Sequence, residues 1–358
     1  MALSRAAALL LLLFVALAAA CARAAVVINT WPFTSATRAA FAALTTSPPS
    51  PAAHLDAVTA GCARCEADQC DFTVGFGGSP DSSGETTLDA MILDGSTMDM
   101  GAVAQLRRVK PAIRVARAVL HHSAHSVLAG DGALAFAKMM GFAETPLETP
   151  YSRALHAQWL RDRCQPNYFR NVAPPQNASC PPFTPVAVGD RDAHRRRKQQ
   201  DDDDDGRAQQ LITRENHDTI GMVALSATGD IAAGTSSNGA NHKIAGRVGD
   251  AAIPGAGAYV DSSVGGAAAT GDGDIMMRFL PAFYAVQEMA KGVHPQVACE
   301  RALVRIAAKY PLFKGGMVCL NRMGEYGGAG HGWDFAFTVQ ATGMSDPQVV
   351  HVRPVALE

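Results

Sequence analysis

A threonine at the start of an apolar stretch is the residue of this sequence with the clearest chemical potential. Thr219 follows Asp218 and precedes the apolar residues 220–227. If the bond between Asp218 and Thr219 were cut, Thr219 would carry a hydroxyl nucleophile and a free α-amine, whose unperturbed pKa is about 7.7–8.0. A threonine hydroxyl activated by its own amine is a recognised catalytic arrangement. An ordinary strand start has the same residues, so the interpretation depends on the rest of the chain.

The segment before Thr219 has the composition of a flexible, charged linker. Residues 187–216 contain a basic run at 195–198 and aspartates at 201–205, with few apolar residues. Such a segment does not form a packed core, and an exposed, flexible segment is where a chain is most readily cut. The basic run could also be a nuclear-targeting signal, but the N-terminus argues against this. The linker therefore supports processing close to Thr219.

Length and composition indicate a globular protein of the secretory pathway. The chain has 358 residues, 48% of them hydrophobic, which is enough to bury a large core. Its 31 basic and 33 acidic residues nearly balance, so the overall charge indicates neither nucleic-acid nor anionic-membrane binding. Residues 1–24 combine Arg5, an apolar run and a small-residue cleavage site, as a signal peptide does. We expect the mature protein in a lysosomal or vacuolar lumen or outside the cell, without a membrane span.

Cysteine usage agrees with an oxidising compartment. Removal of Cys21 with the signal peptide would leave seven of the eight cysteines, so at least one lacks a partner within the chain. Cys62 and Cys65 form a Cys-x-x-Cys pair, but no second pair stands at zinc spacing, which favours local disulfides. The sequon at Asn177 predicts a glycosylation site. The histidines in residues 121–125 have no acidic partner in a metal motif, and the sequence predicts no metal or other cofactor.

Apolar periodicity predicts helices and strands that alternate along the chain, as in an α+β protein. Residues 73–95 combine glycine clusters with alternation and suggest β-hairpins. Two strands joined by a tight turn follow Thr219, and glycine then becomes dense up to about residue 280. The predicted helices are 36–44, 52–67, 112–122, 133–140, 152–163, 281–291 and 295–309, and the predicted strands are 26–29, 220–227, 231–234, 316–321 and 335–340.

Several motifs together resemble those of the aspartylglucosaminidases, or glycosylasparaginases, which are N-terminal nucleophile hydrolases related to type 2 asparaginases and isoaspartyl peptidases. The resemblance covers nearly the whole mature chain. It implies a four-layer αββα sandwich built from an α chain, 25–218, and a β chain, 219–358. The precursor would cut itself before Thr219 by an N-to-O acyl shift, the two chains would stay together, and such units would form dimers. The matching stretches are 27–33, 74–80, 84–91, 217–222, 246–250 and 269–271.

The resemblance also implies roles for individual residues. Thr219 matches the nucleophile, and Arg247 and Asp250 match the residues that hold the α-carboxylate and the α-amine of the substrate. Their chemistry suits these roles, because a guanidinium can hold a carboxylate through two parallel hydrogen bonds and a carboxylate can hold an ammonium. A surface turn with a salt bridge is the structural alternative. Thr270 and Gly271 match the oxyanion hole, where a hydroxyl and a backbone N–H face the developing charge.

Three further positions and the cysteines follow from the same resemblance. Trp31 matches a tryptophan that lines the substrate pocket. Ser237 and Thr73 occupy positions where the family usually has a threonine and a serine, so both departures keep a hydroxyl and we expect the chemistry to survive. The implied disulfides are Cys65–Cys70, Cys164–Cys180 and Cys299–Cys319, with Cys62 free.

The activity implied by the resemblance is that of an amidohydrolase acting on a small molecule. It would cleave glycosylasparagine at the bond between the asparagine side-chain nitrogen and N-acetylglucosamine. The alternatives on the same fold are an L-asparaginase and an isoaspartyl dipeptidase, which act on asparagine and on β-aspartyl dipeptides. The Trp-Pro-Phe at 31–33 favours the first activity, because asparaginase relatives usually lack this tryptophan. A non-catalytic, secreted glycoprotein-binding module is the alternative from another class, and an uncut chain would favour it.

Overall fold

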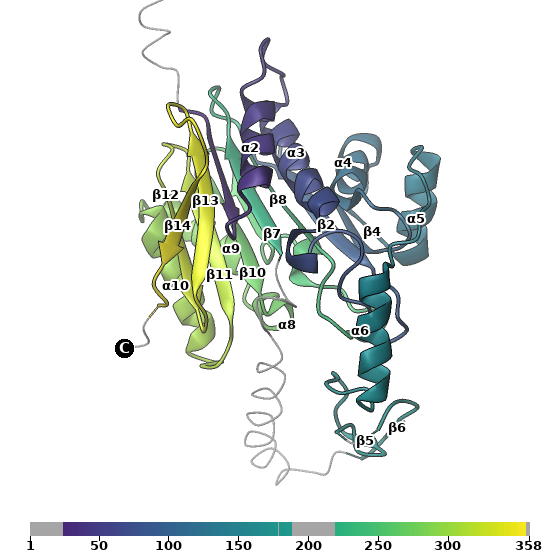
Figure 1. Cartoon of the computed structure of the whole chain (residues 1–358). Helices are drawn as coiled ribbons and strands as arrows, with labels where there is room; N and C mark the ends of the chain where they lie inside the picture. Colours follow the sequence, from purple (N-terminus) through teal and green to yellow (C-terminus); the bar gives the residue numbers. More distant parts are fainter. Residues whose placement is uncertain (1–23, 178, 188–218, 356–358) are drawn as a thin grey trace, which may run out of the picture.

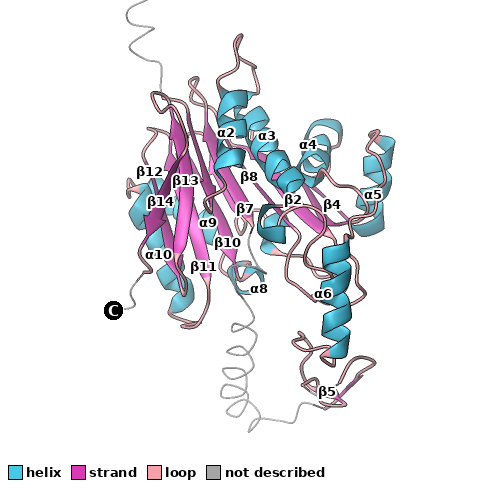
Figure 2. Ribbon diagram, in the orientation of Figure 1, coloured by secondary structure: helices cyan, strands magenta, loops and turns pink. Residues whose placement is uncertain are grey.

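The structure is a computed structural model that describes residues 24–177, 179–187 and 219–355. The predicted signal peptide, except its last residue, the predicted linker, except its first residue, and Asp218 lie outside these residues. Helices and strands are mixed along the chain, and two sheets contain most of the strands (Figures 1 and 2). The predicted α+β class is confirmed.

The larger sheet has eight strands in the order β14-β13-β1-β7-β8-β2-β3-β4. Its centre combines β1 (Val26–Thr30) with β7 (Ile220–Leu225) and β8 (Ile231–Ser237), which run antiparallel to their neighbours. Because β1 lies between β7 and β13, strands from both halves of the sequence share this sheet. The other strands are β2 (Leu88–Asp94), β3 (Met100–Leu106), β4 (Val127–Ala129), β13 (Phe335–Ala341) and β14 (Gln348–Val352).

A smaller sheet packs against the centre of the larger one. Its strand order is β12-β11-β10-β9, and β10 contacts both β7 and β8. The two sheets approach closely, because a Cβ atom added to Gly221 would lie only 2.9 Å from the Cβ of Ala268. Small residues are therefore required where β7 and β10 meet. The strands are β9 (Ala258–Asp261), β10 (Gly265–Gly271), β11 (Gly315–Asn321) and β12 (Tyr326–His331).

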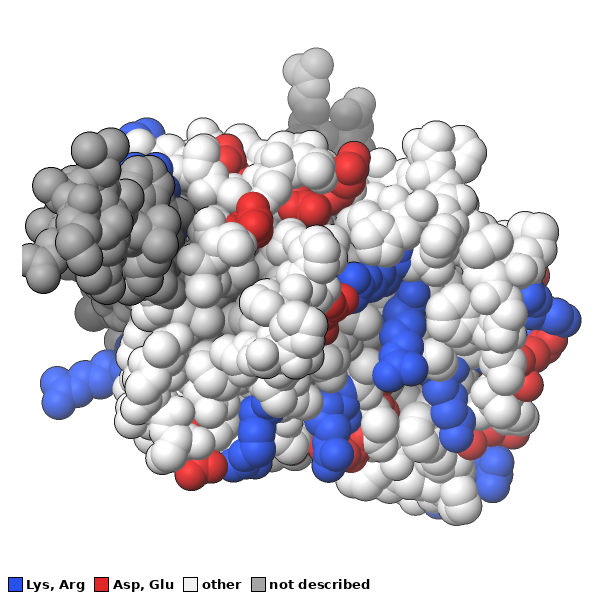
Figure 3. All heavy atoms as spheres, turned by 90° about the horizontal axis from the view of Figure 1, so that it is seen from above, with Lys and Arg blue, Asp and Glu red and all other residues white. Residues whose placement is uncertain are grey.

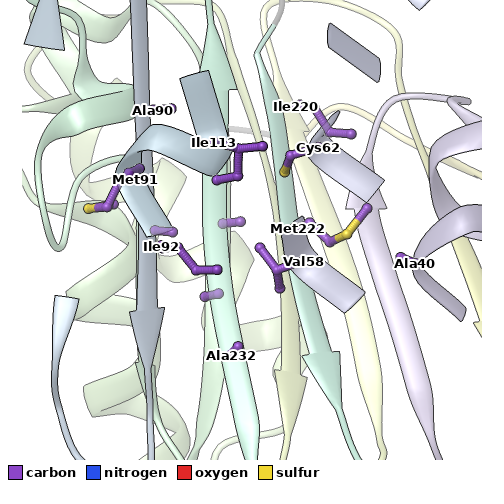
Figure 4. Packing of buried hydrophobic residues seen from close by; sticks show 14 of the residues in the cluster. Ala40, Val58, Cys62, Ala90, Met91, Ile92, Ile113, Ile220, Met222 and Ala232 are labelled. Carbon is purple, nitrogen blue, oxygen red and sulfur yellow. The ribbon is translucent and has the colours of Figure 1, made fainter. Parts of the chain in front are cut away.

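Helices pack on the outer faces of the two sheets (Figure 1). The helices α2 (Thr34–Leu44), α3 (Ala53–Asp68) and α4 (Ala112–His122) cover the larger sheet, and α9 (Pro281–Ala290) and α10 (Pro295–Ala307) contact the smaller one. Figure 4 shows the core beneath α3, where Val58 and Cys62 face Met222 of β7. The remaining elements are η1 (Cys70–Phe72), α5 (Gly130–Met139), α6 (Pro150–Arg161), β5 (Val172–Ala173), β6 (Thr184–Pro185), η2 (Asp250–Ala252) and α8 (Gly273–Met276).

The helices and strands predicted by residue range match the structure, whereas the hairpins predicted over 73–95 are partly wrong and several strands were not predicted. Residues 73–87, all of them described, form turns and irregular loop, so the hairpins predicted over 73–95 are wrong there. Only β2 lies within that stretch, and its hairpin partner β3 follows it. The strands that were not predicted are β3 and β4, the two-residue strands β5 and β6, β9 and β10 in the glycine-dense region, and β12 and β14 near the C-terminus.

The structure contains the disulfides Cys65–Cys70, Cys164–Cys180 and Cys299–Cys319, which are the three pairs that the resemblance implies. Among the described cysteines Cys62 is free, and it is buried. Asn177 is exposed between β5 and β6.

The surface and the helices bear on which partners the protein can have. On the face drawn in Figure 3, basic and acidic side chains are scattered in small groups among uncharged surface. Of the helices in the described part of the chain, none is both long and apolar enough to cross a bilayer. Within the same ranges, no three histidine, cysteine or acidic side chains are grouped so that they could hold a metal ion.

Candidate functional site

Thr219 is buried at the start of β7, beside the end of β1. Only 3% of the residue is exposed. The hydroxyl of Thr30, the last residue of β1, donates to the carbonyl of Thr219 at 2.7 Å and accepts from the backbone nitrogen of Gly221 at 2.9 Å. These two bonds fix the backbone on either side of Ile220. Thr30 was not singled out in the sequence, yet it positions the predicted nucleophile.

The hydroxyl of Thr270 connects the predicted nucleophile with the predicted pocket tryptophan. Its oxygen accepts a hydrogen bond from the backbone nitrogen of Thr219 and another from Nε1 of Trp31, each at 3.0 Å. A hydroxyl oxygen has two acceptor lone pairs and one hydrogen to donate. Because both bonds use the lone pairs, the hydrogen of Thr270 remains for donation to a third group. A donor held in this way suits the stabilisation of a developing negative charge.

Gly271 follows Thr270 at the end of β10, where a side chain cannot fit. Its φ of 128° lies in a region that favours glycine. A Cβ atom added here would lie 2.5 Å from the Cα of Gly315 and 2.5 Å from the carbonyl oxygen of Lys314. Glycine is therefore required at this predicted oxyanion residue, because the backbone of Lys314 and Gly315 lies where a side chain would be.

Ser237 ends β8 at the position opposite Thr219. Ser236 pairs with Ile220 in antiparallel register, so the next opposed positions are those of Ser237 and Thr219. Directly opposed residues of an antiparallel pair have Cβ atoms about 4.5–5.5 Å apart, and their side chains interact. The hydroxyl oxygen of Ser237 accepts a hydrogen bond from the backbone nitrogen of Gly239 at 2.9 Å, which leaves its own hydrogen for another acceptor.

Thr73 contacts the backbone of Asn238, the residue that follows Ser237. It is fully buried, and its carbonyl accepts a hydrogen bond from the backbone nitrogen of Asn238 at 2.8 Å. Its hydroxyl donates to the carbonyl of Cys70 at 3.3 Å. The structure thus connects Thr73 with the end of β8 through the backbone.

Arg247 forms an ion pair with Asp274 close to the end of β10. Its NH2 and Nε atoms lie 2.9 and 3.2 Å from Oδ2 of Asp274. Burial alone would lower the pKa of Arg247, but Asp274 and the other nearby carboxylates raise it above its usual range. The side chain of Arg247 is 13% exposed and that of Asp274 is 42% exposed, so the partner of the guanidinium is the group that a ligand could reach.

Asp250 carries a buried carboxylate oxygen that lacks a donor. Its Oδ2 has no hydrogen-bond partner among the described residues. Burial raises the pKa of Asp250 to about 7, although the nearby Arg247 lowers it. A Cβ atom on Gly273 would lie 2.4 Å from Oδ1 of Asp250, so glycine keeps the space beside this carboxylate open. An unpaired buried carboxylate is costly, and an ammonium group from a ligand would supply the missing donor.

A buried lysine supports the loop that carries the arginine. Lys243 is 2% exposed, and its Nζ donates to the carbonyl of Asn238 at 2.7 Å. Burial lowers the pKa of Lys243 to about 8, while Asp89 acts in the opposite direction. Asp89 also accepts from the backbone nitrogen of Gly249 at 2.8 Å, so both ends of the loop 238–249 are fixed. A lysine in a glycine-rich stretch resembles a solvated residue, and sequence reasoning missed it.

Trp31 is enclosed by aromatic rings from the C-terminal part of the chain. The rings of Trp333 and Phe335 meet it edge-on, with centroids 5.1 and 5.3 Å away. The backbone of Trp31 has a φ of 66°, which is rare for a bulky residue, and its carbonyl accepts a hydrogen bond from Thr338 at 2.8 Å. Strained backbone of this kind is concentrated at functional sites. Trp333 was not predicted, because its contact with Trp31 joins opposite ends of the sequence.

The structure brings most of the predicted site residues together where central strands of the larger sheet begin or end. Antiparallel pairing puts the start of β7, the ends of β1 and β8 and the start of β13 at this end of the sheet. The ion pair of Arg247 and the open carboxylate of Asp250 follow β8, and Trp31 follows β1. The arrangement brings together the predicted hydroxyl nucleophile, a hydroxyl that could donate to a developing charge, a fixed cation and a carboxylate. Asp218 lies outside the described residues, and Asn177 is on a separate loop.

The chain is similar to known proteins over most of its length. A family model described as Asparaginase matches residues 10–346. The chain is 51% identical over 304 residues to the N(4)-(beta-N-acetylglucosaminyl)-L-asparaginase of Rattus norvegicus, covering 85% of this chain and 83% of the relative. It is 50% identical to the protein of that name from Mus musculus, with the same coverage. A relative from Arabidopsis thaliana named probable isoaspartyl peptidase/L-asparaginase 3 is 44% identical over 331 residues, covering 92% of this chain and 90% of the relative.

Proposed function

The chain belongs to the asparaginase family, and from this premise we propose that it hydrolyses N4-(β-N-acetylglucosaminyl)-L-asparagine with an N-terminal threonine. The chain is an amidohydrolase, as its relatives of about 50% identity are. The observation that carries the proposal is the hydrogen bond from the backbone nitrogen of Thr219 to the hydroxyl of Thr270. Cleavage before Thr219 would create a free amine at this position, next to a donor for the oxyanion.

The proposed maturation is self-cleavage between Asp218 and Thr219. It would produce an α chain, 25–218, and a β chain, 219–358. The two chains would remain associated, because β1 of the first is hydrogen-bonded between β7 and β13 of the second. The stacked helices and sheets support the four-layer αββα sandwich of the N-terminal nucleophile hydrolases.

In the first chemical step, the hydroxyl oxygen of Thr219 attacks the side-chain carbonyl carbon of the substrate. Its proton passes to the α-amine of the same residue and then to the leaving nitrogen. The C–N bond breaks, the sugar leaves as a glycosylamine, and an aspartyl ester remains on Thr219. Ser237, opposite the nucleophile, and Thr73 behind it are proposed to tune its hydroxyl.

The negative charge that develops on the carbonyl oxygen would be stabilised by the Thr270 hydroxyl and the Gly271 backbone N–H. The support is that the lone pairs of Thr270 are already occupied by Thr219 and Trp31, which aims the hydroxyl hydrogen elsewhere. Donors oriented before the reaction need no reorganisation when the charge appears. Water then adds to the ester, the amine takes its proton, and aspartate is released with the restored threonine.

Arg247 and Asp250 are proposed to hold the amino-acid end of the substrate. The guanidinium of Arg247 would bind the α-carboxylate of the substrate. The substrate would either share the guanidinium with the exposed carboxylate of Asp274 or displace that carboxylate. The unpartnered Oδ2 of Asp250 would accept from the α-ammonium. A substrate with both groups would neutralise charges that the free site leaves unbalanced, and an asparagine still embedded in a protein would not.

L-asparaginase or isoaspartyl dipeptidase activity is the second candidate, because the Arabidopsis thaliana relative carries such a name. These reactions use the same nucleophile and amino-acid binding residues, and only the leaving group differs. Assays with glycosylasparagine, asparagine and β-aspartyl dipeptides side by side would rank the three activities.

The proposal also includes the compartment, the glycosylation and the assembly of the enzyme. Residues 1–24 would direct the chain into the secretory pathway and then be removed, and the mature protein would reach a lysosomal or vacuolar lumen or the outside of the cell. Asn177, on its exposed loop, would carry a glycan, and two αβ units would form a dimer. The proposed chemistry uses no metal or cofactor.

Thr219→Ala tests the proposal most directly. We expect wild-type protein to contain a fragment that begins Thr-Ile-Gly-Met, and Thr219→Ala to be uncut and inactive in the hydrolysis assay. Intact mass, N-terminal sequencing and the release of aspartate measure these outcomes. Thr219→Ser is the matched control, because it keeps a hydroxyl and should remain cut and active at a lower rate. Hydrolysis by Thr219→Ala would contradict the mechanism, and an uncut wild-type chain would favour the non-catalytic binding module.

A further inference from the structure

The order of strands in the larger sheet separates the two sides of Thr219. On one side, β8 leads into the loop that carries Arg247 and Asp250. On the other side, β1 leads into Trp31, and Trp333 lies two residues before the start of β13. A substrate held by its α-groups on the first side, with its carbonyl at Thr219, extends its leaving group toward the second side. The leaving group therefore lies on the side of Trp31 and Trp333, which we call the tryptophan side.

Trp333 is tied to the two residues proposed to stabilise the oxyanion. Its Nε1 donates to the carbonyl of Gly315 at 3.1 Å, and Gly315 is the register partner of Gly271. Its ring meets Trp31, whose own Nε1 donates to Thr270. Trp333 thus lies one contact away from both oxyanion residues, in the turn that joins β12 to β13.

The two tryptophans differ in what they can offer a ligand. Trp31 is only 1% exposed and is enclosed by Trp333 and Phe335, so its surface is already used inside the protein. Trp333 is half-buried, with its nitrogen bound and its ring anchored at one edge. A large ring fixed in this way is a rigid apolar platform with little conformational entropy to lose on binding.

The chemistry of the leaving group determines what such a platform is for. A pyranose presents C–H groups on its flat face, and these pack against the π-face of an indole through dispersion and weak C–H contacts. Ammonia, the leaving group of asparagine, has no such face. An aromatic wall on this side therefore favours a glycosylated substrate over asparagine without touching the amino-acid end that the two substrates share.

We propose that Trp333 is a specificity-determining residue that stacks on the sugar of the leaving group and thereby selects glycosylasparagine over asparagine. This inference rests on the proposed function of the same site. Trp333 does no chemistry on the scissile bond, so its contribution is confined to substrates that carry a ring beyond the scissile nitrogen.

The test compares kcat/KM for glycosylasparagine and for L-asparagine in processed wild-type protein, Trp333→Ala and Trp333→Phe. For Trp333→Ala we expect kcat/KM for glycosylasparagine to fall about 10- to 100-fold, which is the range for losing a well-packed apolar contact, and that for asparagine to change less than about 3-fold. Trp333→Phe keeps a ring and should retain most of the preference. Met323→Ala, an exposed residue in the turn between β11 and β12, is the control and should leave both values unchanged.

Each other outcome overturns the inference. Equal losses on both substrates would show that Trp333 only supports Trp31 and Gly315, and an unchanged ratio would show that it does not contact the sugar. If Trp333→Ala does not fold, Trp333→Leu provides an apolar side chain without a ring and should show the same selective loss. Wild-type protein that hydrolyses asparagine but not glycosylasparagine would overturn the proposed function as well, whereas wild-type activity with an unchanged ratio in the variants would overturn this inference alone.

Discussion

The two sides of Thr219 are built in opposite ways. The charged side lies on one local loop and its neighbours, with Arg247 and Asp250 only three residues apart. The tryptophan side joins Trp31 to residues of the far end of the chain, such as Thr338 at a sequence separation of 307. The charged side consists of buried charges. The tryptophan side consists of aromatic rings, and the indole nitrogens of Trp31 and Trp333 donate hydrogen bonds within the protein.

This difference indicates which side depends on a ligand. On the charged side, Oδ2 of Asp250 lacks a donor among the described residues and Arg247 shares its guanidinium with an accessible carboxylate. On the tryptophan side, the nitrogens of Trp31 and Trp333 have carbonyl or hydroxyl acceptors at 3.0 and 3.1 Å. The charged side thus lacks hydrogen-bond and charge partners without a substrate, whereas the polar groups of the tryptophan side are satisfied and only its apolar rings are left for contact. In the proposed function, one side would recognise the amino acid and the other side would recognise the leaving group.

Arg247→Gln should have the largest effect, because it removes the fixed charge of the first side. We expect kcat/KM to fall about 10²–10³-fold for glycosylasparagine and for asparagine alike, since loss of one partner of a buried charge pair costs about 2–5 kcal/mol. Steady-state kinetics with both substrates measures this. The equal loss contrasts with the selective loss expected for Trp333→Ala.

Arg301→Gln is a control for the loss of an arginine that is already paired. Arg301 lies 2.6 Å from Glu288, is 53% exposed and belongs to α10. Glu288 is buried and keeps Lys291 as a second partner at 2.6 Å, and neither residue belongs to the proposed site, so activity should remain within about 2-fold of wild type. If Arg247→Gln impaired only one of the two substrates, the separation of the two sides would be wrong.

The family resemblance implied the charged side, because its key residues stand together in one motif at 246–250, which contains Arg247 and Asp250. The apolar run after Thr219 and the tight turn that follows it predicted the hairpin of β7 and β8. The partners of these residues, such as Asp274 and Lys243, could not be predicted from local patterns. Both lie in glycine-rich stretches among other polar residues, and only the folded chain brings them to the site.

The tryptophan side and the strand behind it could not be predicted for two physical reasons. The sequence of β10 is mostly glycine and alanine, which have low strand propensity, yet the closely packed sheets leave room only for small residues there. Tertiary packing therefore decides its conformation. The contact between Trp31 and Trp333 depends on the pairing of β1 with β13, and no local pattern in the sequence specifies this pairing.

Asp250→Asn tests whether the charged side is strained without a ligand. The pKa of Asp250 in the folded protein is about 7, raised from 3.8, so its ionisation opposes folding. The stability contribution of the neutral form is complete below about pH 4 and is lost as the pH rises through 7. Asparagine cannot ionise, so relative to wild type the variant should gain on the order of 1–4 kcal/mol in the free energy of unfolding between pH 4 and pH 8.

The measurement is urea unfolding at both pH values in the Thr219→Ala background, where the chain is expected to stay uncut and unfolds as one molecule. Asp346→Asn makes the same chemical change at an exposed carboxylate paired with Arg38, and its effect should be small at either pH. A difference between Asp250→Asn and wild type that does not vary with pH would remove the electrostatic basis of the comparison.

Trp31→Phe should have the smallest effect and shows where the two sides meet. It keeps an aromatic ring against Trp333 but removes the Nε1 donor to Thr270. The Thr270 hydroxyl then loses one of the two donors that orient it. We therefore expect kcat to fall about 5- to 10-fold for both substrates, because one hydrogen bond contributes about 1 kcal/mol. Trp159→Phe is a matched control, because it removes an indole bond to the carbonyl of Pro166 at 2.6 Å and should leave kcat within about 2-fold. A selective rise in KM for glycosylasparagine in Trp31→Phe would instead mean that Trp31 contacts the sugar itself, and the division of labour between the two tryptophans would have to be reversed.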